Sequence, residues 1–347
     1  MGSKVRYGIS LVADRLSEYP GWVRLAEESG FDMIGLTDSP SVYPETYITG
    51  VLCAQNTSRI RFGPRVTNPL TRNPMVTASA IAGLDELSKG RAILGIGTGD
   101  SAAFHTGNRP ASVKKLGEYA LAVRGLLRGE EVTYNGKQLR LMWTKRNVPV
   151  YLAAAGPKTL RLAAQIADGI IIGTGVSPDI VKATLATIHD AAKEAGRDPN
   201  TLDLWWLCGC RIGPSRAEAI EDAKTFLAAA CNATFQVSLD NKHLPKRLYP
   251  AVEQLCRDYN FWEHVKPGRD AQNARLVERD GLKEYLADRF LVGGTPEDCA
   301  RKIKESAAAG ATQFWWTVNL PDKAAFIRAF SKDVMPLVAS KSPATPA

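Results

Sequence analysis

The fold class is decided by the stretch Trp22-Val-Arg-Leu-Ala-Glu-Glu-Ser-Gly30 and the run that follows it, Phe31-Asp-Met-Ile-Gly-Leu36. The apolar residues of the first run have the spacing of an amphipathic helix, and the second is a short apolar run of strand length. The same order of helix, small-residue turn and strand returns at residues 159–172 and 299–316. Helices that alternate with strands apolar on both faces indicate parallel βα units.

Working outward from this stretch, we predict eight strands, at residues 7–12, 33–37, 60–66, 92–96, 150–154, 169–172, 204–210 and 313–318. Eight helices follow them in order, at about residues 20–29, 44–56, 75–88, 113–128, 158–167, 178–196, 215–230 and 322–337. Eight βα units favour a single (β/α)₈ TIM barrel of the α/β class over an open doubly wound sheet. We expect this barrel domain to span residues 1–340 of the 347-residue chain.

One irregular stretch, at about residues 232–292, interrupts the pattern and is too long for an ordinary loop. It holds several aromatic residues and His264. We expect a helical insertion after the seventh strand, at or near the mouth of the barrel, where it would shape a substrate pocket. Residues 341–347 are rich in proline and alanine and are expected to form a flexible tail.

The composition is that of a globular protein, with 45% hydrophobic and 23% charged residues. The net charge of +8 is spread along the chain, which argues against a nucleic acid partner. Because the chain has neither a run of about 18 apolar residues nor an apolar leader, no membrane partner is expected. The six cysteines lack metal-ligand and disulfide spacing, so we expect free thiols in a cytoplasmic protein.

Polar residues follow four of the predicted strands, at the end where barrel enzymes place their active sites. They are Asp38, Arg65-Val-Thr-Asn68, Gly97-Thr-Gly-Asp100 and Ala155-Gly-Pro-Lys158. At the last of these, backbone N–H groups at a helix start and the charge of Lys158 suit a phosphate, although a proline at the first helical position is also typical of an ordinary helix start. The glycines before Asp100 would let a flat ligand approach the backbone, or would serve a tight turn.

Five residues are candidates for proton transfer: Asp38 and Asp100 at strand ends, and His105, His243 and His264 in segments expected at the mouth. Each could instead have a structural role, capping a turn or hydrogen bonding within the fold. With four histidines and no HxH pair, no metal site is expected.

A set of linked motifs runs along the chain. They are Thr67-Asn-Pro-Leu-Thr-Arg-Asn-Pro74, Thr77-Ala-Ser-Ala80, Leu84-Asp-Glu-Leu-Ser88, Gly90-Arg91, Gly95-Ile-Gly-Thr-Gly-Asp100, Ala154-Ala-Gly-Pro-Lys158, Ala167-Asp-Gly169 and Gly293-Gly-Thr-Pro-Glu297. Together, over about residues 5–340, they resemble the bacterial luciferase-like flavin-dependent oxidoreductases. Within that family the chain is most similar to the branch that contains methylenetetrahydromethanopterin reductase and other deazaflavin enzymes.

The resemblance implies a dimeric barrel that binds FMN or the deazaflavin coenzyme F420 across the carboxyl ends of the strands. It implies that Asp38 contacts the edge of the ring and that Arg65 and Val66 share a bulged, often cis, peptide bond behind the ring. The other cofactor contacts that it implies are Asn68, Thr98, Gly99, Ala155, Gly156, Lys158, Thr159, Gly173 and Thr174.

One departure from the family is informative. In the related deazaflavin-dependent sugar-phosphate dehydrogenases, a histidine follows the aspartate of the second strand and donates a proton, whereas this chain has Ser39. The departure argues against sugar-phosphate oxidation, but it leaves cofactor binding untouched.

The first hypothesis for function is a monooxygenase that uses reduced FMN and O₂ on a small organic substrate. A separate flavin reductase is expected as its partner, because the chain lacks a nicotinamide-binding fingerprint. The alternative is an F420-dependent reductase or dehydrogenase that transfers hydride. Two further hypotheses are a non-catalytic flavin-binding protein and an unrelated barrel aldolase or isomerase that uses Lys158.

Overall fold

The computed structural model describes residues 4–264, 266, 268–279 and 281–340, so the tail expected at 341–347 lies outside the described residues. In the described chain, eight parallel strands follow one another in the order β3-β2-β1-β11-β9-β8-β7-β4. Their bounds are β1 (Arg6–Leu11), β2 (Met33–Leu36), β3 (Arg61–Pro64), β4 (Leu94–Ile96), β7 (Val150–Ala154), β8 (Gly169–Ile172), β9 (Asp203–Ile212) and β11 (Gln313–Val318). Parallel bridges from Phe62 to Ala92 and from Thr67 to Ile96 bring β3 and β4 together, so the ring is nearly closed into the predicted barrel.

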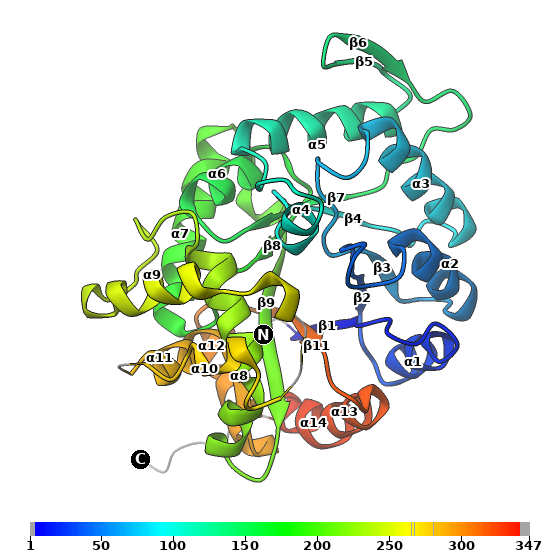
Figure 1. Ribbon diagram of the computed structural model, residues 1–347. Coiled ribbons are helices and arrows are strands. Elements are labelled where there is room, and N and C mark those ends of the chain that lie inside the picture. The colour runs from blue at the N-terminus through cyan, green and yellow to red at the C-terminus, as the bar shows by residue number, and fades with distance from the viewer. Residues whose placement is uncertain (1–3, 265, 267, 280, 341–347) are drawn as a thin grey trace.

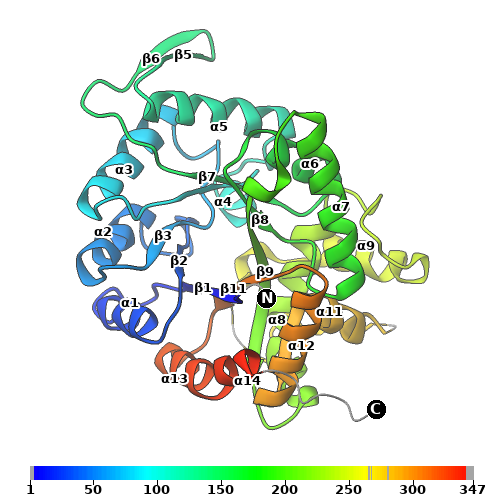
Figure 2. The ribbon, with the colours of Figure 1, turned by 180° about the vertical axis from the view of Figure 1, so that it is seen from behind.

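Helices surround the strands on the outside, as Figures 1 and 2 show from opposite sides. They are α1 (Tyr19–Glu28), α2 (Thr46–Asn56), α3 (Pro74–Leu87), α5 (Val113–Leu127), α6 (Pro157–Ile166), α7 (Pro178–Glu194), α8 (Arg216–Phe235), α12 (Pro296–Ala308), α13 (Lys323–Ala329) and α14 (Met335–Ala339), with a π-helical turn at Phe330–Val334 and a 3₁₀ turn at Pro199–Thr201. Several begin with proline in the first turn after a capping residue, as α3 does after Asn73, whose side chain accepts from Met75 N. None of the described helices is long and apolar enough to cross a membrane.

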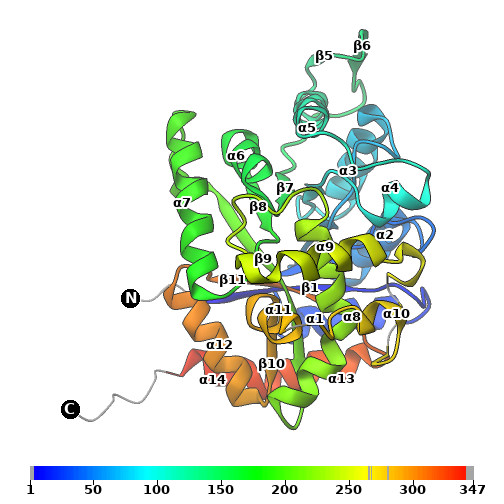
Figure 3. The ribbon, with the colours of Figure 1, turned by 60° about the vertical axis from the view of Figure 1, so that its left-hand side comes forward.

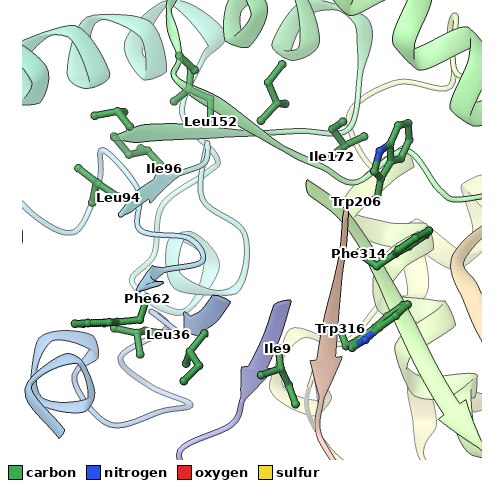
Figure 4. Close-up of a cluster of buried hydrophobic side chains, with 14 of the residues drawn as sticks. Ile9, Leu36, Phe62, Leu94, Ile96, Leu152, Ile172, Trp206, Phe314 and Trp316 are labelled. Atoms are coloured by element: carbon green, nitrogen blue, oxygen red, sulfur yellow. The ribbon is translucent and has the colours of Figure 1, made fainter. Parts of the chain in front are cut away.

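The strands are buried on both faces. Adjacent tryptophans on β9 and on β11 show how a strand contributes both to the core under the helices and to the core inside the barrel. Trp206 and Trp316 point outward and pack with Phe314 and Ile172 under the helices (Figure 4). Trp205 and Trp315 point inward and pack with Met33, Ile93, Tyr151 and Ile171 inside the barrel. Because successive side chains of a strand point to opposite faces, adjacent tryptophans can serve both sides.

The expected insertion is helical in the described residues. It contains α9 (Tyr249–Asp258), α10 (Gln272–Arg275), α11 (Leu282–Phe290) and 3₁₀ turns at Lys246–Leu248 and Phe261–Glu263. The helices α9, α10 and α11 pack against α8, and the group is seen from the side in Figure 3. Buried residues such as Leu227, Leu255 and Leu286 give this group an apolar core of its own.

Four features differ from the prediction. The stretch 232–292 includes the end of α8 and the start of an additional strand, β10 (Leu291–Gly294), which pairs with the second half of β9. A hairpin of β5 (Glu131–Tyr134) and β6 (Lys137–Arg140) projects beyond α5 (Figure 1). The segment after Asp100 that holds His105, expected to be a loop, begins with the short helix α4 (Ser101–His105). The predicted C-terminal helix at 322–337 is interrupted by the π-helical turn.

Candidate active site

The carboxyl ends of β2, β3 and β4 bring together one group of the predicted residues. The Arg65–Val66 peptide bond is cis, as the resemblance implied. Just after it, Thr67 N donates to Gly95 O at 2.9 Å, and Gly97 N donates to Thr67 O at 2.8 Å, so the bulged segment docks on β4. Asn68 is buried, and its Oδ1 accepts from the backbone of Leu70 and Thr71.

The glycines of β4 serve this docking. A Cβ on Gly97 would lie 2.8 Å from Val66 Cγ2, and one on Gly95 would lie 2.4 Å from Pro64 O. The close approach that the glycines permit is therefore made by the chain's own β3 segment, rather than by a flat ligand as the sequence suggested. Gly99 has a φ of +92°, which is the left-handed region that favours glycine, and lies beside Asn68. Thr98 is half-buried and accepts from Ala111 N at 2.7 Å.

Asp38 is buried and belongs to an ion-paired network. Its Oδ2 accepts from Arg72 Nη1 at 2.6 Å, and Arg72 Nη2 donates to Glu45 Oε1 at 2.5 Å. The Arg72 guanidinium thus donates to both carboxylates and compensates their negative charge. The geometry therefore makes Asp38 a hydrogen-bond acceptor and a charge partner, and it gives less support to a proton-donating role.

Asp100 faces the insertion. Its Oδ1 accepts from Gln236 Nε2 at 3.2 Å, and it directly precedes α4, which lies over the centre of the ring in Figure 1. Tyr259 and His264 of the insertion are joined by a hydrogen bond of 2.7 Å between the hydroxyl and Nδ1. Burial lowers the pKa of His264, and the nearby charge of Asp100 opposes that shift. Asp100, Tyr259 and His264 thus form one group of titratable residues at the mouth.

His105 joins three segments. Its Nδ1 lies 2.5 Å from Ser41 Oγ, its Nε2 lies 3.0 Å from Phe261 O, and its ring stacks on Trp262. A neutral ring that donates from Nε2 and accepts at Nδ1 satisfies both contacts. The arrangement supports a linking role for His105 between α4 and the insertion, more than the proton transfer predicted from the sequence. Ser39, at the position of the family histidine, is buried and bonds to Ser101 Oγ at 2.7 Å.

The strand ends of β7 and β8 form a second group, across the barrel. Gly156 precedes α6, with its N–H directed to Thr159 Oγ1 at 3.3 Å. Gly173 N donates to Ala154 O at 2.8 Å, and the Thr174 hydroxyl lies 2.9 Å from that of Thr184. A small pocket here is lined by Ala155, Gly156, Pro157, Leu160, Thr174, Ile180, Ala183, Thr184, Thr187, Asn241, Lys242, His243 and Arg289.

The insertion supplies the cations of this pocket. Lys242 reaches across Gly156 and donates to Thr234 O at 2.5 Å, and burial lowers its pKa to about 8. Arg289 is buried and donates from Nε to Thr174 O at 2.7 Å. Lys158, the predicted phosphate ligand, is exposed and is not among the lining residues. Sequence reasoning missed Lys242 and Arg289 because no motif marks them; only the aromatic content of the insertion pointed to this segment.

The pocket fits the phosphate of a flavin-type cofactor in its donor chemistry. None of its lining residues is a carboxylate, two are cations, and a helix begins at Gly156. The lysine side chain is flexible, and it has to swing off Gly156 to admit a phosphate. Among the described residues, no cluster of three or more His, Cys, Asp or Glu could hold a metal ion.

Comparison with known proteins gives consistent matches over nearly the whole chain. The family model for luciferase-like monooxygenases matches residues 3–313. The 5,10-methylenetetrahydromethanopterin reductase of Methanolobus tindarius is 31% identical over 340 residues, which cover 95% of this chain and 99% of the relative. The F420-dependent glucose-6-phosphate dehydrogenase of Kineococcus radiotolerans is 27% identical, over 90% of each chain.

A solved structure agrees with these sequence matches. The coenzyme F420-dependent tetrahydromethanopterin reductase of Methanopyrus kandleri superposes with a TM-score of 0.76 at 27% identity, covering 96% of this chain and 99% of that protein. The barrel and its insertion are therefore shared with a protein that uses the deazaflavin.

Proposed function

The chain belongs to the luciferase-like monooxygenase family of oxidoreductases, and we propose that it is a coenzyme F420-dependent enzyme that transfers hydride between the cofactor and a small organic substrate. The observation that carries the proposal is the full-length similarity to 5,10-methylenetetrahydromethanopterin reductase, at 31% identity over 95% of this chain. The bulged β3 segment and the pocket at β7 and β8 support it, because they provide places for the ring and the phosphate of such a cofactor.

This proposal reverses the order of the two hypotheses drawn from the sequence. The monooxygenase hypothesis, with FMN and O₂, now rests on membership of a family that is described by that activity. The F420 hypothesis rests in addition on relatives that cover almost the whole chain. Sugar-phosphate oxidation remains disfavoured because Ser39 replaces the histidine and is engaged with Ser101.

Bound F420 would supply the hydride chemistry, since its ring carries two electrons and a proton as one unit. The chain would do the rest. Lys242, Arg289 and the start of α6 would hold the phosphate, and the Val66 segment would back the ring. The insertion, seated on α4 through His105 and Phe261, would restrict the entry of water to the mouth. Asp100 would hold or release the proton that accompanies hydride transfer.

Cofactor titration tests the proposal. Purified protein should bind F420 at least tenfold more tightly than FMN, as followed by cofactor fluorescence. Reduced F420, supplied from a separate source, should be stable in air on the protein and should be oxidised only when an acceptor is added. Tighter binding of FMN, with rapid O₂ consumption by the reduced complex, would favour the monooxygenase instead.

A further inference from the structure

Arg65 is a partly buried cation without an ion-pair partner among the described residues. Its Nη2 donates to Thr317 Oγ1 at 3.0 Å, its guanidinium lies over the ring of Trp315, and its Nε is buried without a partner. Burial lowers the pKa of Arg65 to about 10, so the group stays charged at neutral pH. Tyr43 and Cys208 lie near it, and both are neutral at that pH because burial raises the pKa of each.

Three buried lysines of the described chain are paired with carboxylates, whereas the buried Arg211 and Arg289 donate to backbone carbonyl oxygens instead. Lys224, Lys302 and Lys323 each lie within 3 Å of a carboxylate oxygen. Arg65 forms no ion pair within 4 Å among the described residues, and Asp38, which follows the neighbouring strand β2, is paired with Arg72. A desolvated charge without a partner is costly, and such groups are usually compensated by a ligand or an opposite charge.

Two more polar groups without partners lie beside Arg65. Ser10 Oγ and Trp315 Nε1 are both buried and unpartnered. All three side chains meet around Gly35, where an added Cβ would lie 2.1 Å from Ser10 Oγ and 3.0 Å from both Arg65 Cβ and Trp315 Cζ2. The indole N–H and the guanidinium can only donate, and the hydroxyl can donate as well. A set of free donors around a positive charge matches a group that accepts only, such as a carboxylate.

This donor cluster (Ser10, Arg65 and Trp315) lies across the barrel from the phosphate pocket. Register pairs Ser10 with Thr317 on β11 and with Gly35 on β2. In the strand order, β1 and β2 stand opposite β7 and β8. Arg65 and Thr317 are partly exposed, whereas Ser10 and Trp315 are buried, so Arg65 and Thr317 form the accessible side of this part of the barrel.

We propose that the donor cluster binds the carboxylate of the organic substrate, and that the substrate of this enzyme is a small carboxylic acid. The proposal rests on the function proposed above and adds the substrate class to it. A carboxylate is the simplest group that satisfies the free Nε, the indole N–H and the hydroxyl together while neutralising the guanidinium. A ring oxygen of the cofactor has the same acceptor chemistry, and the experiment separates the two sources.

The test compares acetate with acetamide, its neutral analogue, at constant ionic strength. Binding is followed by calorimetry and by the shift in unfolding temperature, with and without F420. The variants are Arg65→Gln, which removes the charge, and Arg65→Lys, which keeps the charge but loses the planar set of donors of the guanidinium. Arg61→Gln is the matched control, because Arg61 lies at the other end of the same strand beside Asp203 and Tyr151.

Wild type and Arg61→Gln should bind acetate at least tenfold more tightly than acetamide. Arg65→Gln should lose that preference, and Arg65→Lys should keep part of it. Equal acetate binding by wild type and Arg65→Gln would overturn the proposal, as would a tenfold loss of F420 affinity with acetate binding unchanged, since the donors would then serve the cofactor. If wild type fails to bind F420, the proposed function fails, but the acetate comparison on the cofactor-free protein still decides the role of Arg65.

Discussion

Lys242 places an ammonium group with a lowered pKa beside a helix start, which makes cofactor binding sensitive to pH. Replacing Lys242 with Gln should weaken F420 binding at least tenfold at pH 7, because a charge-assisted hydrogen bond contributes about 1.5 to 3 kcal/mol. As the pH rises through about 8, wild-type affinity should fall, since the ammonium form that attracts phosphate is lost. Dissociation constants measured from pH 6.5 to 9.5 on both proteins check this. Ionisation of the cofactor itself affects both proteins alike, so the pH dependence of the ratio of the two constants reports on Lys242.

Lys158→Gln is the matched control for Lys242, because Lys158 is exposed at the start of the same helix. It should change the affinity less than threefold. A larger loss at Lys158 than at Lys242 would restore the phosphate role that the sequence assigned to Lys158.

Asp100 is the residue to test for proton transfer. Asp100→Asn keeps an oxygen that can accept from Gln236 but removes the titrating carboxyl. We expect turnover of an accepted substrate to fall about 10²-fold, within the range typical of general acid–base groups, with F420 affinity retained. His105→Ala should instead loosen the contact of α4 with the insertion, which would show as a raised KM. Normal turnover in Asp100→Asn together with an inactive His105→Ala would assign the proton to the histidine.

The candidate-site residues that the sequence could place are those that follow strands. Asp38, the cis Arg65–Val66 pair and Gly156 occupy positions set by the (β/α)₈ register, and motifs mark them. Lys242, Arg289 and Tyr259 reach the mouth only because the insertion folds back over it. That placement depends on tertiary packing, for which no local periodicity exists. For Arg65, the sequence predicted the cis peptide bond to Val66, whereas the lack of an ion-pair partner for its side chain is visible only in the structure.

At the scale of elements, a buried asparagine joins two segments of the insertion, the turn at Asn260 and the helix α10. Asn273 is fully buried, its Oδ1 accepts from Asn260 N at 3.0 Å, and its Nδ2 donates to Asn260 O at 2.8 Å. Asn273→Ala would leave both backbone groups unpaired, so the free energy of unfolding should fall by about 1 to 3 kcal/mol. Urea unfolding measures this. Asn108→Ala, whose side chain is exposed and bonds only within its own turn, should stay within about 0.5 kcal/mol of wild type.

The elements missed from the sequence have specific physical reasons. Tyr134-Asn135-Gly136-Lys137 carries the Asn-Gly pair of a two-residue hairpin, and both central residues adopt positive φ, at 49° and 71°. The Asn-Gly pair is visible in the sequence, but it lies between a predicted helix and the next predicted strand, where we expected a loop without secondary structure. β10 has only four residues, two of them glycine, and it forms because β9 extends to Ile212 and offers a free edge.

At the scale of the whole molecule, exposed apolar side chains gather on neighbouring outer elements. On α2 and α3, Ile48 is 55% exposed and Val76 is 54% exposed. Trp143, after the hairpin, is 52% exposed and bonds to Ser79 of α3 through its indole N–H. Because α2 packs on α3, and Trp143 bonds to α3, these side chains lie on elements in contact with one another. Large exposed apolar patches on a stable protein usually mark an interaction surface.

A second copy of the chain is the occupant we expect for this face, in keeping with the dimer that the family resemblance implies. A stable homodimer buries about 800 Å² or more of each partner around a central apolar patch, which Ile48, Val76 and Trp143 could provide. Val76→Asp combined with Ile48→Asp should therefore convert a dimer into a folded monomer, because two charges desolvated in each copy oppose association. Val237→Asp, in the insertion and 83% exposed, is the control that should stay dimeric. Sedimentation velocity measures the mass and thermal unfolding confirms the fold. A wild-type monomer at micromolar concentration, or a double variant that remains dimeric, would show that this face is not the interface of a homodimer.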